Sequence, residues 1–201
     1  MKLTQILNTL MNEVGEGTSQ PFEYSLKSST MRTISGERGI EYSGVIDYAI
    51  EAETSKGENL EVILSVVSVG NQTPKQAAGS SMNKEIEAYF NDRPYVRIFD
   101  ISFAINEPEI GNMGTINYGT IVNDKVYMFR LMATIKQILL PLIEKYQPDA
   151  ISYSPEKRPK EKHSDTAPSR HNLYKRFIEK SVPVKKILTG WEGSEYLFVI
   201  K

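Results

Sequence analysis

The stretch that decides the fold runs from Val126 to Phe177. It begins with VYMFRLMATIKQILLPLIEKY (126–146), in which apolar residues recur at helical spacing, and continues with the short apolar run DAISYS (149–154). A charged segment, PEKRPKEKHSDTAPS (155–169), then leads into SRHNLYKRF (169–177), where the helical spacing returns. The order helix, strand, helix predicts one α/β crossover unit, which builds a site where strand ends meet helix starts.

The long helix is predicted to be a core helix. Its apolar stripe consists of Met128, Met132, Ile135, Leu139, Leu142 and Tyr146, widened by Leu131, Ile138 and Ile143. A stripe this broad indicates burial against other elements. Lys136, Gln137 and Pro141 interrupt the longest apolar run, so we expect no membrane span and no membrane partner. Pro141 is expected to kink the helix or to start a new turn.

Upstream of this unit the apolar residues alternate with period two. GIEYSGVIDYAIEAE (39–53) and LEVILSVVSVG (60–70) flank the turn TSKGEN and predict a hairpin with one solvated face. Ser43, Asp47 and Glu51 are expected on that solvated face. FEYSLKSST (22–30) and MRTIS (31–35) predict two shorter strands before the hairpin.

The remaining elements complete a single α+β domain. We expect a helix at 4–14, a loop at 71–81, a helix at 82–90, strands at 95–105 and 115–123, and a closing hairpin of VPVKKILTG (182–190) and SEYLFVIK (194–201). The predicted fold is therefore a mostly antiparallel sheet over residues 1–201. Residues 1–94 supply the first helix and antiparallel strands, and residues 95–201 supply the crossover unit.

Composition excludes several classes of function. The chain has 201 residues, is 40% hydrophobic and 24% charged, and has a formal net charge of -1, so no overall field draws it onto nucleic acid or anionic lipid. It has no cysteine, which excludes disulfides and thiolate chemistry. His163 and His171 stand eight residues apart without a HExxH pattern, so we expect no metal.

The charged segment and the helix after it hold the candidate binding residues. These are Lys157, Arg158, Lys160, Lys162, Arg170, His171, Lys175 and Arg176. Because Glu156, Glu161 and Asp165 are interspersed, one interpretation is a solvated loop. The other is a basic patch that contacts a nucleic-acid backbone or an acidic partner.

The order of elements over 95–201 resembles the C-terminal half of the GNAT acyltransferases. In that family the last helix often carries a leucine and a tyrosine, and the tyrosine can protonate the leaving thiolate of coenzyme A. Leu173 and Tyr174 occupy the matching place, so the resemblance implies Tyr174 as a catalytic general acid. GNAT enzymes hold the cofactor pyrophosphate on a glycine-rich turn before the long helix. Here TIVNDKVYMFR (120–130) has no glycine and adds the charge of Asp124, so we expect no cofactor, with acetyl-CoA only for an active acyltransferase.

Three segments also resemble a group of small proteins encoded by tailed bacteriophages. Phe129–Leu140, Pro148–Ser154 and Ser169–Arg176 are similar to the group's VFxTVIxIIxxFL, PDxIxFS and SRxxLYxR patterns. The resemblance implies an accessory or virion-associated protein in the host cytoplasm or the virion. We expect it to act by binding a protein partner or by self-assembly, without catalysis. A GNAT-type acyltransferase using Tyr174, and nucleic-acid binding through residues 157–176, are the alternatives.

Overall fold

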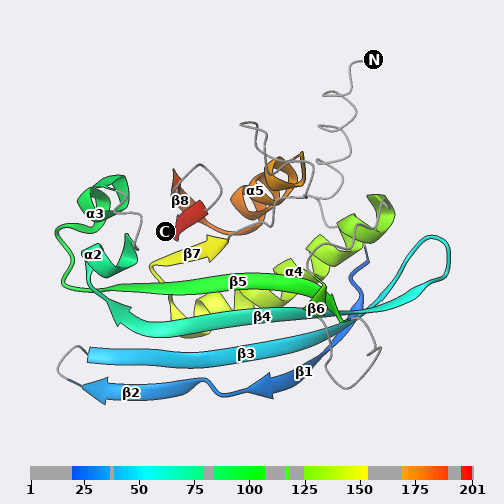
Figure 1. Cartoon of the computed structure of the whole chain (residues 1–201), viewed down its shortest axis with the longest axis horizontal. Helices are drawn as coiled ribbons and strands as arrows, with labels where there is room; N and C mark the ends of the chain where they lie inside the picture. Colours follow the sequence, from blue (N-terminus) through cyan, green and yellow to red (C-terminus); the bar gives the residue numbers. More distant parts are fainter. Residues whose placement is uncertain are drawn as a thin grey trace, which may run out of the picture.

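The protein is a single mixed α+β domain dominated by an open sheet (Figure 1). The computed structural model describes residues 20–36, 39–78, 84–106, 116–117, 125–153, 169–189 and 196–200. The expected helix at 4–14 and the charged loop at 155–168 lie outside these residues. For the described residues, the prediction of a single, mostly antiparallel α+β domain is confirmed.

The described strands form one nine-stranded sheet. They are β1 (Glu23–Ser29), β2 (Arg32–Gly36), β3 (Gly39–Glu53), β4 (Asn59–Gln72), β5 (Val96–Asn106), β6 (Ile116–Asn117), β7 (Ala150–Tyr153), β8 (Val184–Thr189) and β9 (Tyr196–Ile200). The order is β1-β3-β4-β5-β7-β9-β8, with β2 also paired to β3 and β6 to β5. Only the pair β5–β7 is parallel among the described strands.

The described helices are α2 (Pro74–Ala77), α3 (Lys84–Phe90), α4 (Lys125–Tyr146) and α5 (Ser169–Ser181). The loop expected at 71–81 is wrong in part, because Asn71 and Gln72 end β4 and α2 follows. Thr73 caps α2: its hydroxyl accepts from the Gln76 N–H, and the Gln76 side chain accepts from the Thr73 N–H. This reciprocal capping box explains why a helical turn forms there.

The β3–β4 hairpin confirms the predicted period-two pattern. Ile46, Ile50, Val62, Leu64 and Val66 are all buried, and they belong to one hydrophobic cluster with α4. Tyr48 lies on the same face and packs against this cluster, whereas the alternate residues Asp47, Ala49, Ile63 and Ser65 lie on the opposite face and are only partly buried. One face of these strands therefore builds the core and the other stays open.

Helix α4 covers the buried face. Its buried side chains are those of Tyr127, Leu131, Met132, Thr134, Ile135, Ile138, Leu139, Leu142, Ile143 and Tyr146. The predicted stripe is confirmed, with Met128 only partly buried, and the helix runs through Pro141 to Tyr146. By length and composition, Val126–Tyr146 is also the one described helix that suits a membrane span, with a mean hydropathy of 1.4. In this structure its apolar stripe packs on the sheet.

The other half of the sheet is covered on both faces. On β7 and β9, Ile151 and Phe198 join the α4 cluster, whereas Ala150 and Val199 join a second cluster with Phe90 of α3. Neighbouring residues of a strand point to opposite faces, so α3 lies across the sheet from α4. The final strand β9 lies between β7 and β8, which confirms the predicted closing hairpin.

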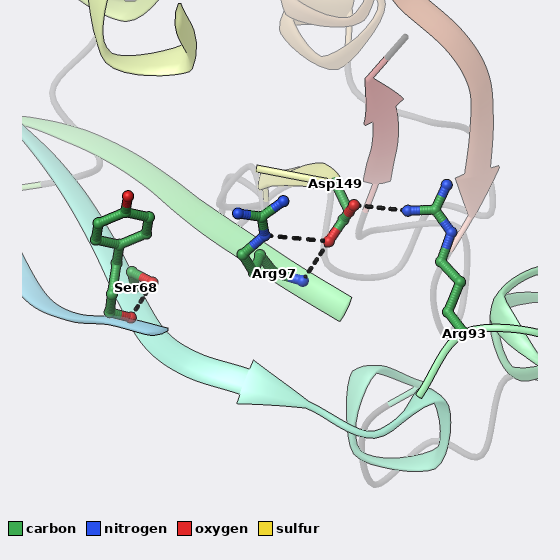
Figure 2. A network of polar contacts seen from close by, with 5 residues as sticks. Ser68, Arg93, Arg97 and Asp149 are labelled. Carbon is green, nitrogen blue, oxygen red and sulfur yellow. Dashed lines mark hydrogen bonds and ion pairs between the residues drawn. The ribbon is translucent and has the colours of Figure 1, made fainter. Parts of the chain in front are cut away.

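Asp149 joins the strands at the parallel pair (Figure 2). Its carboxylate accepts from the Arg93 guanidinium at 2.6 Å and from the Arg97 backbone N–H at 2.8 Å. The Asp149 N–H donates to the Arg97 carbonyl, and the Ile200 N–H donates to the Asp149 carbonyl, both at 2.9 Å. One residue therefore fixes the starts of β5 and β7 and the end of β9.

At the opposite side of the sheet, the chain crosses Gly44 as it passes from β1 to β2. Both strands pair with β3, β1 along its second half and β2 along its first. The Thr30 N–H donates to the Val45 carbonyl at 2.8 Å. A Cβ at Gly44 would lie 2.5 Å from the Thr30 carbonyl oxygen, and Gly44 has φ +132. Only glycine fits this crossing without strain.

We expect Gly44→Ala to lower the free energy of unfolding by about 2–4 kcal/mol, because the methyl group meets backbone and the φ angle is unfavourable. Gly36→Ala is the matched control, since a Cβ there meets nothing within 4 Å. Denaturant unfolding of both variants measures the difference. Equal stability of the two variants would contradict the proposed crossing.

Candidate protein-binding edge

The strands β1 and β2 form an exposed edge of the sheet. Every residue of both strands is exposed, and β1 stands at the end of the strand order among the described residues (Figure 1). Large apolar side chains are exposed on and beside this edge, namely Tyr24 (37%), Leu26 (59%), Ile34 (47%) and Ile40 (56%). We call β1 and β2 together the β1–β2 edge.

The backbone of β1 has a defined outward side. Val45 accepts from Thr30, so the carbonyl of Val45 points toward β1. Along a strand, alternate residues point their N–H and C=O groups to the same side. The backbone N–H and C=O groups of Ala49 and Glu51 therefore also point toward β1. Those of their partners, Ser25 and Glu23, point back toward β3.

It follows that Tyr24 and Leu26 direct their backbone N–H and C=O groups away from β3. Their side chains lie on the α4 side of the sheet, since they are in register with Ile50 and Tyr48. Tyr24 packs edge-on against Tyr48, with ring centroids 6.1 Å apart. A β-bulge follows, because the register shifts between Leu26 and Ser28.

On the open face, three glutamates stand in register across three strands. Glu23 pairs with Glu51, and Glu51 pairs with Glu61. Like charges directly opposite one another are unfavourable. Lys27, in the bulge, compensates part of this charge, because its Nζ lies 2.9 Å from Glu61 Oε1.

Glu61 has a lowered pKa. The hydrogen bond from Lys27 is the largest cause, followed by that from the Asn106 amide at 2.5 Å, while partial burial acts in the opposite direction. Both bonds stabilise the ionised carboxylate. Lys27 therefore ties β1 across β3 to β4. Glu23 and Glu51 form no ion pair with any other residue in the described part of the chain.

The residues just before β1 are held by α4. The Phe22 N–H donates to Thr134 Oγ1 at 2.8 Å, and the same hydroxyl donates to the Arg130 carbonyl at 2.8 Å. Arg130 covers the Phe22 ring at 4.1 Å from its centroid and donates through Nε to the Gln20 carbonyl at 3.0 Å. Thr134 is fully buried, so its hydroxyl is the acceptor that satisfies the Phe22 N–H.

A pocket of about 620 Å³ lies where the ends of β1, β3 and β4 meet α4. It is lined by residues 20–23, 51–53 and 59–61 together with Arg130. The lining includes the three glutamates in register and also Glu53. No group of three or more His, Asp or Glu side chains among the described residues has the arrangement to hold a metal ion.

The predicted binding residues are only partly placed. Lys157, Arg158, Lys160 and Lys162 lie outside the described residues. Arg170, His171 and Tyr174 belong to α5, but their side chains are likewise outside what the structure describes. Lys175 is half-buried and Arg176 is exposed on the same helix, which packs into the core through Phe177, Ile178 and Val182. These residues remain predictions.

Sequence reasoning did not single out the β1–β2 edge. One signal was present: the TSKGEN turn centres the hairpin so that Glu51 opposes Glu61. The pairing of β1 with β3, the Lys27 bulge and the Thr134 contact are long-range features without a local sequence signal. In comparisons with protein-family models, curated proteins and solved structures, the chain finds no match.

We expect Thr134→Val to lower the free energy of unfolding by about 1–3 kcal/mol, because it leaves the Phe22 N–H buried without an acceptor. Thr134→Ser is the control, since it keeps the hydroxyl and removes one methyl group. Denaturant unfolding measures both. An equal loss of unfolding free energy in the two variants would mean that the Thr134 hydroxyl does not contribute and that Thr134 acts by packing alone.

The Lys27–Glu61 pair predicts a pH-dependent contribution to stability. The pKa of Glu61 is lower in the folded chain than its ordinary value of 4.5, so the pair stabilises the fold above that pH and the contribution disappears as pH falls through the folded pKa. Lys27→Met should therefore lower the melting temperature slightly at neutral pH and not in strong acid. Lys56→Met, an exposed lysine in the hairpin turn, is the control. A Lys27→Met deficit that is the same at every pH would contradict this assignment.

Proposed function

We propose that this chain acts by binding a protein partner through the β1–β2 edge, without catalysis. The observation that carries the proposal is the direction of the β1 backbone. Tyr24 and Leu26 present their N–H and C=O groups outward, beside apolar side chains that are exposed. Proteins generally cover or blunt such edges, because an open edge is a template for another strand.

The recognition mode that fits this edge is strand addition. An extended segment of the partner would take the outward hydrogen bonds of β1, and its alternate side chains would meet Tyr24 and Leu26 on one face and Glu23 on the other. The Lys27 bulge limits the regular edge to the residues before it. The bound segment is therefore expected to be short.

We further propose that the protein is an accessory or virion-associated protein of a tailed bacteriophage, acting in the host cytoplasm or the virion. This part of the proposal rests on the three segments of sequence that resemble such proteins, Phe129–Leu140, Pro148–Ser154 and Ser169–Arg176. This origin agrees with a binding role. The proposal that β1 binds a partner does not depend on it.

A finer fold proposal is that residues 95–201 resemble a GNAT domain. The succession β5, β6, α4, β7, α5, β8, β9, with β5 parallel to β7, supports it. The corresponding activity would use acyl-CoA with Tyr174 as general acid, and a third proposal is nucleic-acid binding through residues 157–176. Most side chains that these two activities need lie outside the described residues, so these two proposals rest on the sequence.

Leu26→Pro tests the edge directly. Proline removes the Leu26 N–H, which points away from β3, and proline is tolerated at edges and bulges, so the fold should persist. We expect affinity for a purified partner, first captured from infected cells with the parent chain, to fall roughly tenfold or more, whereas Leu26→Ala changes it less.

Ser25→Pro is the matched control for direction, because the Ser25 N–H points toward β3. Thermal unfolding should show a larger loss of stability for Ser25→Pro than for Leu26→Pro. A partner that binds Leu26→Pro as tightly as the parent would overturn the proposed function.

A further inference from the structure

We propose that the β1 edge binds the β1 edge of a second copy of this chain, antiparallel and in a register centred on Ser25. This inference rests on the proposed function and names the partner. A two-fold axis beside Ser25 relates the two strands, so each copy presents the same surface to the other. The result is one continuous sheet across both copies.

The backbone directions permit this register. In an antiparallel pair, opposite residues either exchange both hydrogen bonds or exchange none. Centring on Ser25 places Tyr24 opposite Leu26 of the second copy, and both residues point their N–H and C=O groups outward. The backbone N–H and C=O groups of Ser25 point toward β3 of their own copy. The two Ser25 residues therefore face each other as a pair without hydrogen bonds.

The side chains are complementary in the same register. Tyr24 and Leu26, both exposed in one copy, would cover each other on the α4 side of the sheet. On the open face Glu23 would lie opposite Lys27 of the second copy. Lys27 belongs to that face because its Nζ reaches Glu61, which is in register with Glu51 and Glu23.

Neighbouring registers lack this match. Centring on Tyr24 would oppose Tyr24 to itself and Glu23 to Ser25. Centring on Leu26 would oppose Lys27 to Ser25 and Glu23 to Ser29. Only the register centred on Ser25 joins opposite charges and apolar side chains together. It also brings Lys27 of the second copy, which within one copy is paired with Glu61, toward Glu23, which faces Glu51 and has no ion pair among the described residues.

Edge pairing over so few residues buries little surface compared with stable dimers. The dimer is therefore expected to be concentration-dependent, and sedimentation equilibrium of the full chain should show a monomer–dimer equilibrium. Leu26→Pro should shift that equilibrium to the monomer.

A cysteine scan tests the register, because the chain contains no cysteine of its own. Opposing residues in a pair without hydrogen bonds have Cα atoms about 4.5 Å apart, which allows a disulfide. Under mild oxidation Ser25→Cys should form a linked dimer. Ser29→Cys, on the same strand but beyond the bulge and away from its counterpart in the second copy, should remain monomeric.

Charge reversal gives a second test that misfolding cannot imitate. Glu23→Lys alone and Lys27→Glu alone each oppose like charges and should be monomeric. Their equimolar mixture places opposite charges at both ends of the pair and should recover the dimer.

Two results separate the inference from the proposed function. A strictly monomeric parent, with Ser25→Cys linking no faster than Ser29→Cys, overturns the second-copy proposal. The proposed function still holds after that result if Leu26→Pro binds a different protein partner more weakly than the parent chain does. If Leu26→Pro alters neither self-association nor partner binding, both proposals fall.

Discussion

The position of the sheet edge depends on one buried hydroxyl. Thr134 of α4 accepts from the Phe22 N–H, 112 residues away in the chain, and its neighbour Arg130 covers the Phe22 ring. β1 has a neighbour on one side only among the described strands, so contacts at its ends decide whether it is ordered. An ordered edge is preorganised for binding, because the entropy of fixing it has already been lost on folding.

Two further contacts hold the strand without using its outer side. The crossing at Gly44 brings Thr30 onto Val45, and Lys27 reaches over β3 to Glu61. Each of these contacts acts from within the sheet or along its open face. None of these contacts uses the outward N–H and C=O groups of Tyr24 and Leu26, on which the proposed binding depends. The same contacts that stabilise the fold therefore define the proposed binding surface.

Local patterns predicted much of the fold. Period-two alternation located the β3–β4 hairpin, the apolar stripe located α4, and the paired apolar runs at the end of the chain located β8 and β9. The capping box formed by Thr73 and Gln76 favours a helix at α2, although the segment was expected to be a loop. Long-range features were not predictable, because pairing of β1 with β3 and insertion of β9 beside β7 depend on partners distant in sequence. The predicted basic patch at 157–176 stays a prediction, whereas the β1–β2 edge became visible only in the folded chain.

Amide hydrogen exchange along β1 in dilute protein tests the central claim most directly. The account predicts slow exchange at Phe22, which is bonded to Thr134, and at Ser25, which points toward β3, with fast exchange at Tyr24 and Leu26. Uniformly fast exchange across these four amides would show that the edge is not held. Slow exchange at Tyr24 and Leu26 in the monomer would show that the outward side of β1 is already occupied, and either result would contradict the account.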